Sequence, residues 1–187
     1  MKYTAPSWES FHTSVFRLAK KIYASDYRFD LIVAIARGGL TVAHIFSDFF
    51  NRPITTFTIS TYTDLKQHRV PEIILKIGDK LDHKQILLVD DVSDTGKTFV
   101  RGINYLKELG ASEIRTAAVY IKPWTKFVPD YFVKKTAAWI VFPYEVKETI
   151  GALSKNLKQE KISDRKIRKV FAKIGIPKRY LDFFYSS

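Results

Sequence analysis

One segment constrains the fold more than any other part of the chain: residues 86–98 read ILLVDDVSDTGKT. A short run of Ile, Leu and Val is typical of a strand buried on both faces of a parallel sheet. Asp90 and Asp91 follow this run directly, so they emerge at the carboxyl end of the predicted strand, where open α/β sheets bind ligands. The segment therefore predicts a strand, an acid pair, a short loop and the start of a helix.

The loop of this segment is suited to a phosphate group. The backbone N–H groups of residues 94–98 would be the unsatisfied donors of the first helical turn. Together with the helix dipole they favour a bound phosphate by about 0.3–1 kcal/mol or more, and Thr95 and Thr98 add hydroxyl donors. We interpret the segment as a sugar-phosphate site; the alternative is a strand-to-helix turn whose acids serve only as caps.

A nucleoside triphosphatase loop is the obvious rival, because residues 95–98 read TGKT, like the end of the motif GxxxxGKT. The first glycine of that motif would fall at Asp91. A carboxylate side chain cannot offer the close backbone approach that glycine gives to a phosphate chain. The motif is therefore incomplete, and we set this interpretation aside.

Composition limits the remaining classes of protein. A chain of 187 residues with 46% hydrophobic content is long enough for one domain and perhaps an appendage. It has no cysteine and four scattered histidines, which excludes disulfides and thiolate metal sites and implies that any metal arrives with the substrate. With no long apolar run and no secretion-signal pattern, we expect a cytoplasmic protein without a membrane segment. Few Asn, Gln and Met suggest a hot-living source.

The positive charge is unevenly distributed. The net charge is +12, of which residues 146–187 carry +7. The +5 that remains on residues 1–145 suits electrostatic steering of a polyanionic substrate. The basic tail could have a different role, such as binding RNA or DNA, or it could have no separate role.

Strand and helix patterns alternate up to about Glu145, where charge density rises. This alternation predicts an α/β fold with a mostly parallel central sheet flanked by helices. We therefore divide the chain into a domain of residues 1–145 and a basic helical C-terminal appendage of residues 146–187. The predicted strands are 29–36, 53–60, 71–77, 114–121 and 138–142, and the predicted helices follow Ser7, Gly38, Gly96, Ser163 and Pro177. Residues 61–70 are predicted as a polar loop.

Two other predicted strand ends carry chemistry. Arg37 and Gly38 follow a strand, where a fixed cation and approachable backbone suit a diphosphate. Lys122 follows another strand and Trp139 opens the next, a cation and an aromatic plane that together could hold a purine. An ammonium donates to an exocyclic oxygen and leaves an amino group unmatched, so adenine should be rejected. Taken singly, these residues are as compatible with a surface salt bridge, a core tryptophan and a solvated lysine.

The acid-pair segment resembles the signature of the type I phosphoribosyltransferases, which bind phosphoribosyl pyrophosphate (PRPP). The order of several motifs resembles the bacterial xanthine-guanine phosphoribosyltransferases over residues 1 to about 145: ARGG, ISTY, the acid pair, KP, PDY and WIxxPYE. The resemblance implies the type I phosphoribosyltransferase fold, with a small hood beside the parallel sheet. It also implies a cis peptide between Ala36 and Arg37 and a loop over residues 61–70 that closes on PRPP.

The same resemblance implies the roles of individual residues. Asp94 would be the general acid/base near the purine N7, while Asp90 and Asp91 would hold the ribose hydroxyls and a Mg²⁺ ion, partly through water. Lys122 would read O6, Trp139 would stack on the base, and the carbonyl of Ile140 would meet N1 or N2. The implied PRPP-binding set is Arg37, Gly38, Ser60, Tyr62, Asp90, Asp91, Val92, Ser93, Asp94, Thr95, Gly96, Lys97 and Thr98. Two positions depart from the family pattern, Ala36 in place of a loop serine and Lys97 in place of a small residue.

The implied activity is purine salvage: transfer of the 5-phosphoribosyl group from PRPP to N9 of guanine, hypoxanthine or xanthine. The products would be GMP, IMP or XMP and pyrophosphate, with Mg²⁺ as cofactor and a homodimer or tetramer as the assembly. Two alternatives stay open from the sequence. One is a PRPP-binding transcriptional or RNA-binding regulator that uses the basic tail, and the other is an orotate or adenine transferase, which Lys122 and Trp139 disfavour.

Overall fold

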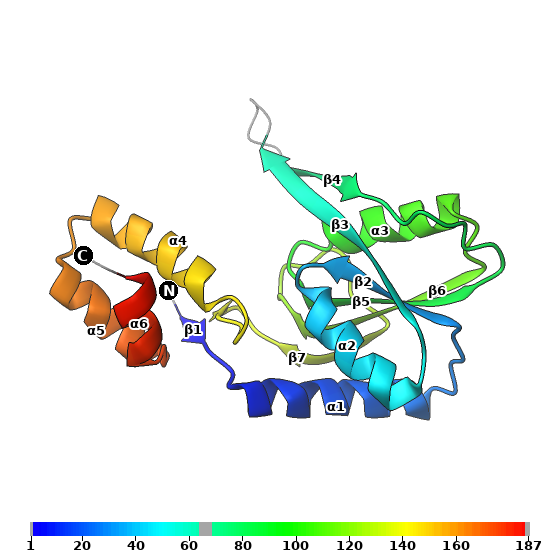
Figure 1. Cartoon of the computed structure of the whole chain (residues 1–187), viewed down its shortest axis with the longest axis horizontal. Coiled ribbons are helices and arrows are strands. Elements are labelled where there is room, and N and C mark those ends of the chain that lie inside the picture. The colour runs from blue at the N-terminus through cyan, green and yellow to red at the C-terminus, as the bar shows by residue number, and fades with distance from the viewer. Residues whose placement is uncertain (1, 64–68, 186–187) are drawn as a thin grey trace. The chain divides into compact units, whose positions relative to one another are not determined.

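The computed structural model describes residues 2–63 and 69–185. Two compact units are formed, and each is described by itself. The larger unit contains His12–Thr136, and the smaller one combines Met1–Phe11 with Ala137–Ser187. The elements, labelled in Figure 1, are β1 (Tyr3–Thr4), α1 (Trp8–Ala24), β2 (Leu31–Ala36), α2 (Gly39–Phe50), β3 (Ile54–Thr63), β4 (Arg69–Leu75), β5 (Gln85–Ser93), α3 (Lys97–Glu108), β6 (Glu113–Ile121), β7 (Tyr131–Lys135), β8 (Trp139–Ile140), α4 (Val146–Gln159), α5 (Asp164–Ile174) and α6 (Lys178–Phe184).

The larger unit is built on a sheet with the strand order β4-β3-β2-β5-β6-β7. All neighbouring strands pair in parallel except β3 and β4, which are antiparallel. Helix α2 lies on one face of this sheet and α3 on the other (Figure 1). The mostly parallel α/β fold expected from the alternating pattern is therefore confirmed.

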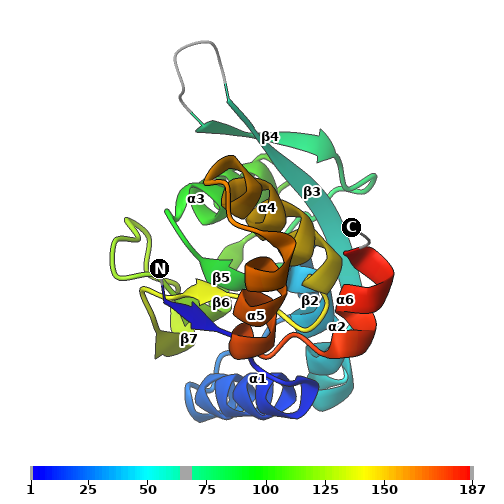
Figure 2. The ribbon, with the colours of Figure 1, turned by 90° about the vertical axis from the view of Figure 1, so that its left-hand side faces the viewer.

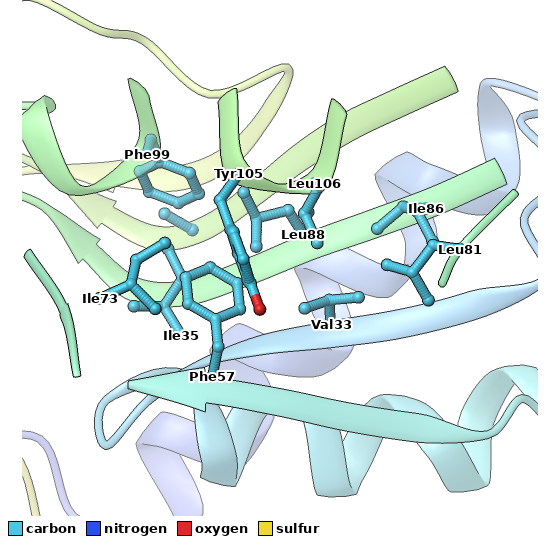
Figure 3. Packing of buried hydrophobic residues seen from close by; sticks show 11 residues of the cluster. Val33, Ile35, Phe57, Ile73, Leu81, Ile86, Leu88, Phe99, Tyr105 and Leu106 are labelled. Atoms are coloured by element: carbon cyan, nitrogen blue, oxygen red, sulfur yellow. The ribbon is translucent and has the colours of Figure 1, made fainter. Parts of the chain in front are cut away.

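Apolar side chains on one face of the central strands meet the apolar stripe of α3 in a buried cluster. Figure 3 shows this packing, in which Val33 and Ile35 from β2, Phe57 from β3 and Leu88 from β5 lie against Phe99 and Leu106 of α3. Gly102 of α3 is small because a Cβ there would lie 3.1 Å from the Phe57 ring. This core fixes α3 on the sheet and so fixes the loop that precedes it.

Residues 61–70 correct one prediction from the sequence. Residues 61–63 belong to β3 and residues 69–70 to β4, and the two strands pair through Tyr62↔Val70 and Thr63↔Arg69. The polar composition suggested a loop, but β-branched and aromatic residues also suit a paired edge hairpin. Residues 64–68, the rest of the predicted closing loop, lie outside the described residues. A second difference is β7, a strand that the sequence analysis did not predict.

The smaller unit has its own apolar core. Two-residue strands β1 and β8 pair in parallel, Tyr3 with Trp139 and Thr4 with Ile140. Helices α4, α5 and α6, seen from the side in Figure 2, follow β8 in the chain. The helix predicted after Ser163 contributes buried residues to this core. The buried cluster contains Val141, Ile150, Ile167, Phe171, Ile176, Leu181 and Tyr185.

The division of the chain differs in position from the boundary proposed near Glu145. Residues 2–11 and 137–145 lie in the same unit as the C-terminal helices, because β1 pairs with β8 across more than 130 residues of sequence. Ser7 caps α1 within this unit, since its hydroxyl accepts the Ser10 N–H at 3.1 Å. The helix predicted to follow Ser7 is confirmed.

Candidate active site

The acid pair lies at the carboxyl end of β5 and is buried. Asp90 and Asp91 are only 8% and 5% exposed. The Asp91 backbone N–H donates to Asp90 Oδ1 at 2.9 Å, which fixes the first carboxylate against its own backbone. Buried charges are costly unless they are paired or hydrogen-bonded, so two of them at a strand end mark this position as chemically specialised.

The turn between β2 and α2 lies directly against the second carboxylate. A Cβ at Gly38 would lie 2.6 Å from Asp91 Oδ2, and a Cβ at Gly39 would lie 2.4 Å from the Val89 carbonyl oxygen. Both positions therefore need glycine for this turn to approach β5. The peptide between Ala36 and Arg37 is cis, as the family resemblance implied, and the Arg37 side chain is exposed.

The loop after the acid pair leads straight into α3. Gly96 has φ +84° and is the residue before the first helical turn, so its backbone is in the left-handed region that glycine tolerates best. Helix α3 begins at Lys97, and its first N–H groups have no partner one turn earlier in the helix. Asp94, Thr95 and Lys97 are exposed beside this helix start, which is the arrangement that the sequence predicted for a phosphate.

A second loop, residues 122–127, packs on the first. The Lys122 N–H donates to the Ser93 carbonyl oxygen at 3.0 Å, and the Lys126 N–H donates to the Thr95 carbonyl oxygen at 3.1 Å. A Cβ at Gly96 would lie 2.5 Å from Phe127 Cβ. The two loops leave the neighbouring parallel strands β5 and β6 at the same edge of the sheet.

Ser93 has a structural task in this contact. Its Oγ lies 2.8 Å from the Phe127 carbonyl oxygen and 3.0 Å from Thr125 Oγ1. The side chain of Ser93, a residue predicted to bind PRPP, thus anchors the 122–127 loop, and the predicted PRPP contact of Ser93 falls to its backbone.

Lys122 is a buried cation next to the predicted general acid/base. It is 8% exposed, and burial lowers the pKa of its ammonium group, while the nearby Asp94 carboxylate opposes that shift. Lys122 Nζ also lies 5.6 Å from the centroid of the Trp124 ring. A cation is thus brought to the same sheet edge as the acid pair.

Trp124 is a residue of this cluster that the sequence analysis missed. Its indole Nε1–H donates to Asp94 Oδ1 at 2.8 Å. The available signal was a large aromatic residue placed directly after the Lys122-Pro123 pair in a polar loop. That signal was weak, because nothing in the local sequence around Trp124 indicates a contact with Asp94, thirty residues away.

Ser60 and Tyr62 lie near the end of β3, beyond the register position Thr58, which pairs with Ala36 at the end of β2. Their backbone therefore extends past the same carboxyl edge. The Ser60 side chain is half-buried, and the Tyr62 side chain lies outside the described part of the chain.

Trp139 and Ile140 form β8 and belong to the smaller unit. The Trp139 side chain is about half exposed and lines a small cavity of about 70 Å³ with Tyr3 and Leu153. Ile140 is buried. The contact of these two residues with a purine stays a prediction.

No helix among residues 2–63 and 69–185 is both long and apolar enough to span a membrane.

Comparison with known proteins accounts for this arrangement of strand ends. The family profile described as "Phosphoribosyl transferase domain" matches residues 7–149. The chain belongs to the phosphoribosyltransferase family. The family match covers the acid pair, the 122–127 loop and β8, and it identifies the protein as a transferase with the type I phosphoribosyltransferase fold.

Individual relatives of this phosphoribosyltransferase are also similar over most of its length. The xanthine-guanine phosphoribosyltransferase of Idiomarina loihiensis is 30% identical over 143 residues, which is 75% of this chain and 85% of that protein. The crystal structure of a purine phosphoribosyltransferase from Pyrococcus horikoshii is 38% identical, with a TM-score of 0.70, and the match covers 77% of this chain and 94% of that one. The xanthine-guanine-hypoxanthine phosphoribosyltransferase of Helicobacter pylori is 25% identical, with a TM-score of 0.70 and coverage of 84% and 99%. None of these similarities supports the alternative of a nucleic-acid-binding regulator.

Proposed function

We propose that this phosphoribosyltransferase transfers the 5-phosphoribosyl group from PRPP to N9 of a 6-oxopurine, namely guanine, hypoxanthine or xanthine. The products are the nucleoside 5′-monophosphate, GMP, IMP or XMP, and pyrophosphate. The observation that carries the proposal is the buried Lys122 beside Asp94, at the sheet edge that also holds the buried acid pair. The purine substrates named for the relatives in Idiomarina, Pyrococcus and Helicobacter support it.

In this proposal the PRPP half of the site is formed by β5, the start of α3 and the turn before α2. The first N–H groups of α3 and the hydroxyls of Thr95 and Thr98 hold the 5′-phosphate. Arg37 and Gly38 take the diphosphate, and the acid pair takes the ribose hydroxyls. Other residues at the same edge of the sheet contact PRPP through their backbone or side chains. They are the rest of the predicted PRPP-binding set: Ser60, Tyr62, Val92, Ser93 and Lys97.

Mg²⁺ is the cofactor we propose, and the donors present fit it. Mg²⁺ prefers oxygen ligands and is often held by one or two carboxylates together with substrate phosphates and water. Asp90 and Asp91 are such a carboxylate pair. In the described part of the chain no three His, Cys, Asp or Glu side chains are grouped as a metal site, so the remaining ligands would come from PRPP and water. When bound, the ion would neutralise charge on the departing pyrophosphate.

The reaction breaks the bond between ribose C1 and the pyrophosphate oxygen and forms a bond from C1 to N9 of the base. The base loses a proton, which Asp94 accepts near N7, and the transition state has oxocarbenium character. The protein's contribution is orientation and electrostatic stabilisation, since both reactants are held at one sheet edge by fixed donors. Exclusion of water from this edge limits hydrolysis of PRPP.

Selectivity for a 6-oxopurine follows from the charge of Lys122. Its ammonium donates to the exocyclic O6, and adenine would instead present an amino donor to this donor. Trp139 stacking on the base and the Ile140 carbonyl at N1 or N2 complete the proposed recognition. Which oxopurine is preferred depends on contacts at C2, where guanine and xanthine differ.

The test is a spectrophotometric assay with PRPP and Mg²⁺ against guanine, hypoxanthine, xanthine and adenine in parallel, with pyrophosphate release measured as a second readout. We expect turnover of one or more oxopurines and none of adenine. Turnover of adenine at a comparable kcat/KM would contradict the role given to Lys122. Absence of turnover with every base, despite measurable PRPP binding, would overturn the proposed function.

We also propose a cytoplasmic enzyme from a hot-living source that assembles as a homodimer or tetramer. Exposed aromatic side chains, including Phe16 and Phe183, support the assembly, and the low Asn and Gln content supports the hot-living source. Light scattering of the purified protein would measure the assembly, and its melting temperature would test the thermal origin.

A further inference from the structure

Trp124 is the member of the active-site cluster to which the proposed function assigns no role. Its side chain is 53% exposed, so core packing does not explain why a tryptophan stands there. It belongs to the 122–127 loop, whose backbone is tied to Ser93 and Thr95 through hydrogen bonds at 3.0 and 3.1 Å. The indole is thus carried by a segment that is held firmly on the loop containing Asp94.

The indole makes one directed contact, its Nε1–H to Asp94 Oδ1 at 2.8 Å. An indole has one hydrogen-bond donor and no acceptor, so in this contact Trp124 is always the donor and the Asp94 carboxylate the acceptor. Asp94 is exposed on a loop, where a short side chain would otherwise sample several rotamers. The hydrogen bond engages one carboxylate oxygen and leaves the other for proton transfer with the base.

The face of the same ring lies near Lys122, whose Nζ is 5.6 Å from the ring centroid. A cation over an indole face is attracted by the ring quadrupole, and tryptophan is the best of the aromatic residues for this. Burial disfavours the charged lysine, and Asp94 favours it. The ring therefore adds a second support for the ammonium in a site that is only 8% exposed.

We propose that Trp124 is a positioning residue that sets Asp94 and Lys122 in their relative geometry, with its N–H on the carboxylate and its ring face on the ammonium. The proposal rests on the proposed function, because Asp94 and Lys122 are the groups that handle the base in that reaction. One side chain thereby links the proton acceptor of the reaction to the cation that selects the oxopurine.

Trp124→Phe separates the two contacts, because phenylalanine keeps an aromatic face and loses the N–H donor. With guanine, hypoxanthine or xanthine as the base, we expect kcat to fall about tenfold, while KM for PRPP stays within about twofold. Trp124→Ala also removes the ring face, and it should raise KM for the base in addition. Trp8→Phe is the matched control: Trp8 is 54% exposed and outside the proposed machinery, and this variant should keep the kinetics of the unmodified chain.

A double-mutant cycle identifies the partner of the indole. In an Asp94→Ala background, Trp124→Phe should change kcat by less than about twofold, because the acceptor of the hydrogen bond is gone. A purely structural role would lower kcat by the same factor in both backgrounds, or would raise KM for PRPP through the neighbouring phosphate loop. Either result would overturn the proposal, as would a Trp124→Phe variant with unchanged kcat.

A spectroscopic measurement tests the contact without relying on turnover. The chain has three tryptophans, so replacing Trp8 and Trp139 by Phe leaves Trp124 as the only indole. Asp94→Ala in this background should shift the emission of Trp124, and an unchanged spectrum would count against the contact. If the unmodified chain turns over oxopurines and Trp124→Phe matches it, only this inference fails; if the unmodified chain turns over no base, the proposed function fails and takes the inference with it.

Discussion

The two units of the chain differ in whether they bury charged side chains. Among the residues of the larger unit whose burial is described, the buried charged side chains are Asp90, Asp91 and Lys122. In the described part of the smaller unit the ion pairs, such as Lys158–Asp164 at 3.5 Å and Arg168–Asp182 at 3.4 Å, are partly exposed and surround an apolar core.

The difference has an energetic reason. Burial of a charge costs desolvation free energy, whereas an exposed charge stays hydrated. A buried charged group that served only folding could therefore be replaced by an apolar one with little loss of stability. Exposed ion pairs contribute about 0–1 kcal/mol each. We therefore interpret the buried charge as a mark of the proposed active site, and the +7 of residues 146–187 as a solvated surface over a helical core. Five substitutions test this comparison.

Asp94→Asn should have the largest effect. An amide cannot accept the proton from the base, and general acid/base groups contribute about 10²- to 10⁴-fold to rate. We expect kcat to fall at least about 10²-fold while the affinity for PRPP, measured by titration calorimetry in the presence of Mg²⁺, stays nearly the same. Equal turnover in this variant would remove Asp94 from the proton-transfer role.

Gly38→Ala should damage the larger unit's site through packing. The new Cβ would lie 2.6 Å from Asp91 Oδ2, so the carboxylate or the turn must shift, and overpacking of this kind costs about 1–3 kcal/mol. We expect PRPP binding to weaken about tenfold or more, as measured by calorimetry.

Gly151→Ala is the matched control from the smaller unit. Gly151 is in helix α4, and a Cβ there would have no neighbour within 4 Å. Alanine should therefore stabilise the chain by about 0.5–1 kcal/mol in chemical denaturation and leave PRPP binding unchanged. Weaker PRPP binding in Gly151→Ala, or unchanged PRPP binding in Gly38→Ala, would contradict the distinction between the two units.

Lys122→Met should lower the activity with oxopurines and raise the thermal stability of the chain. Burial lowers the pKa of Lys122, so below its ordinary pKa of 10.5 the unfolded chain binds more protons there than the folded chain, and stability rises as the pH rises through this window. Replacing the charge should raise the melting temperature by about 1–3 °C at neutral pH and lower kcat/KM for oxopurines about tenfold, because the hydrogen bond to O6 is lost. The gain should shrink as the pH approaches 10.5; a gain that is constant with pH would show that desolvation of the ammonium is not its cause.

Tyr185→Phe should have the smallest effect and be confined to stability. The Tyr185 hydroxyl donates to Asp164 Oδ1, and this bond is the main reason that the pKa of Asp164 is lowered. Burial and Asp164 raise the pKa of Tyr185 to about 12, so the hydroxyl remains a donor at neutral pH. We expect the melting temperature to fall by about 1–3 °C at neutral pH with kcat unchanged.

The pH dependence of this effect has a definite sign. A carboxyl with a lowered pKa in the folded chain contributes stability above its ordinary pKa of 3.8 and loses it as the pH falls through the lowered value. The difference between Tyr185→Phe and the unmodified chain should therefore be largest above pH 3.8 and shrink in stronger acid. A loss of kcat would contradict the assignment of Tyr185 to folding alone.

The sequence predicted those helices and strands that are encoded by residues close together in the chain. The strand β5, the acid pair and the start of α3 are consecutive in the chain, and a run of apolar residues followed by acids and a glycine carries all the information needed. Helix α5 was predicted in the same way, from Ser163 before it, and it is followed by Gly175, where φ is +96°. The motif order also implied the family and the cis peptide between Ala36 and Arg37, and both are confirmed.

Contacts between distant residues were beyond such reasoning. Trp124 meets Asp94 across thirty residues, because parallel pairing aligns Ser93 with Ile121 and sends the two following loops out at the same edge. Tyr3 meets Trp139 in the same way, through the pairing of β1 with β8. The sequence alone predicted most of the groups to which the proposed chemistry is assigned, because residue type and local spacing encode that. Only the tertiary structure decided which of them share a loop surface or a unit, because strand register is a property of the whole sheet.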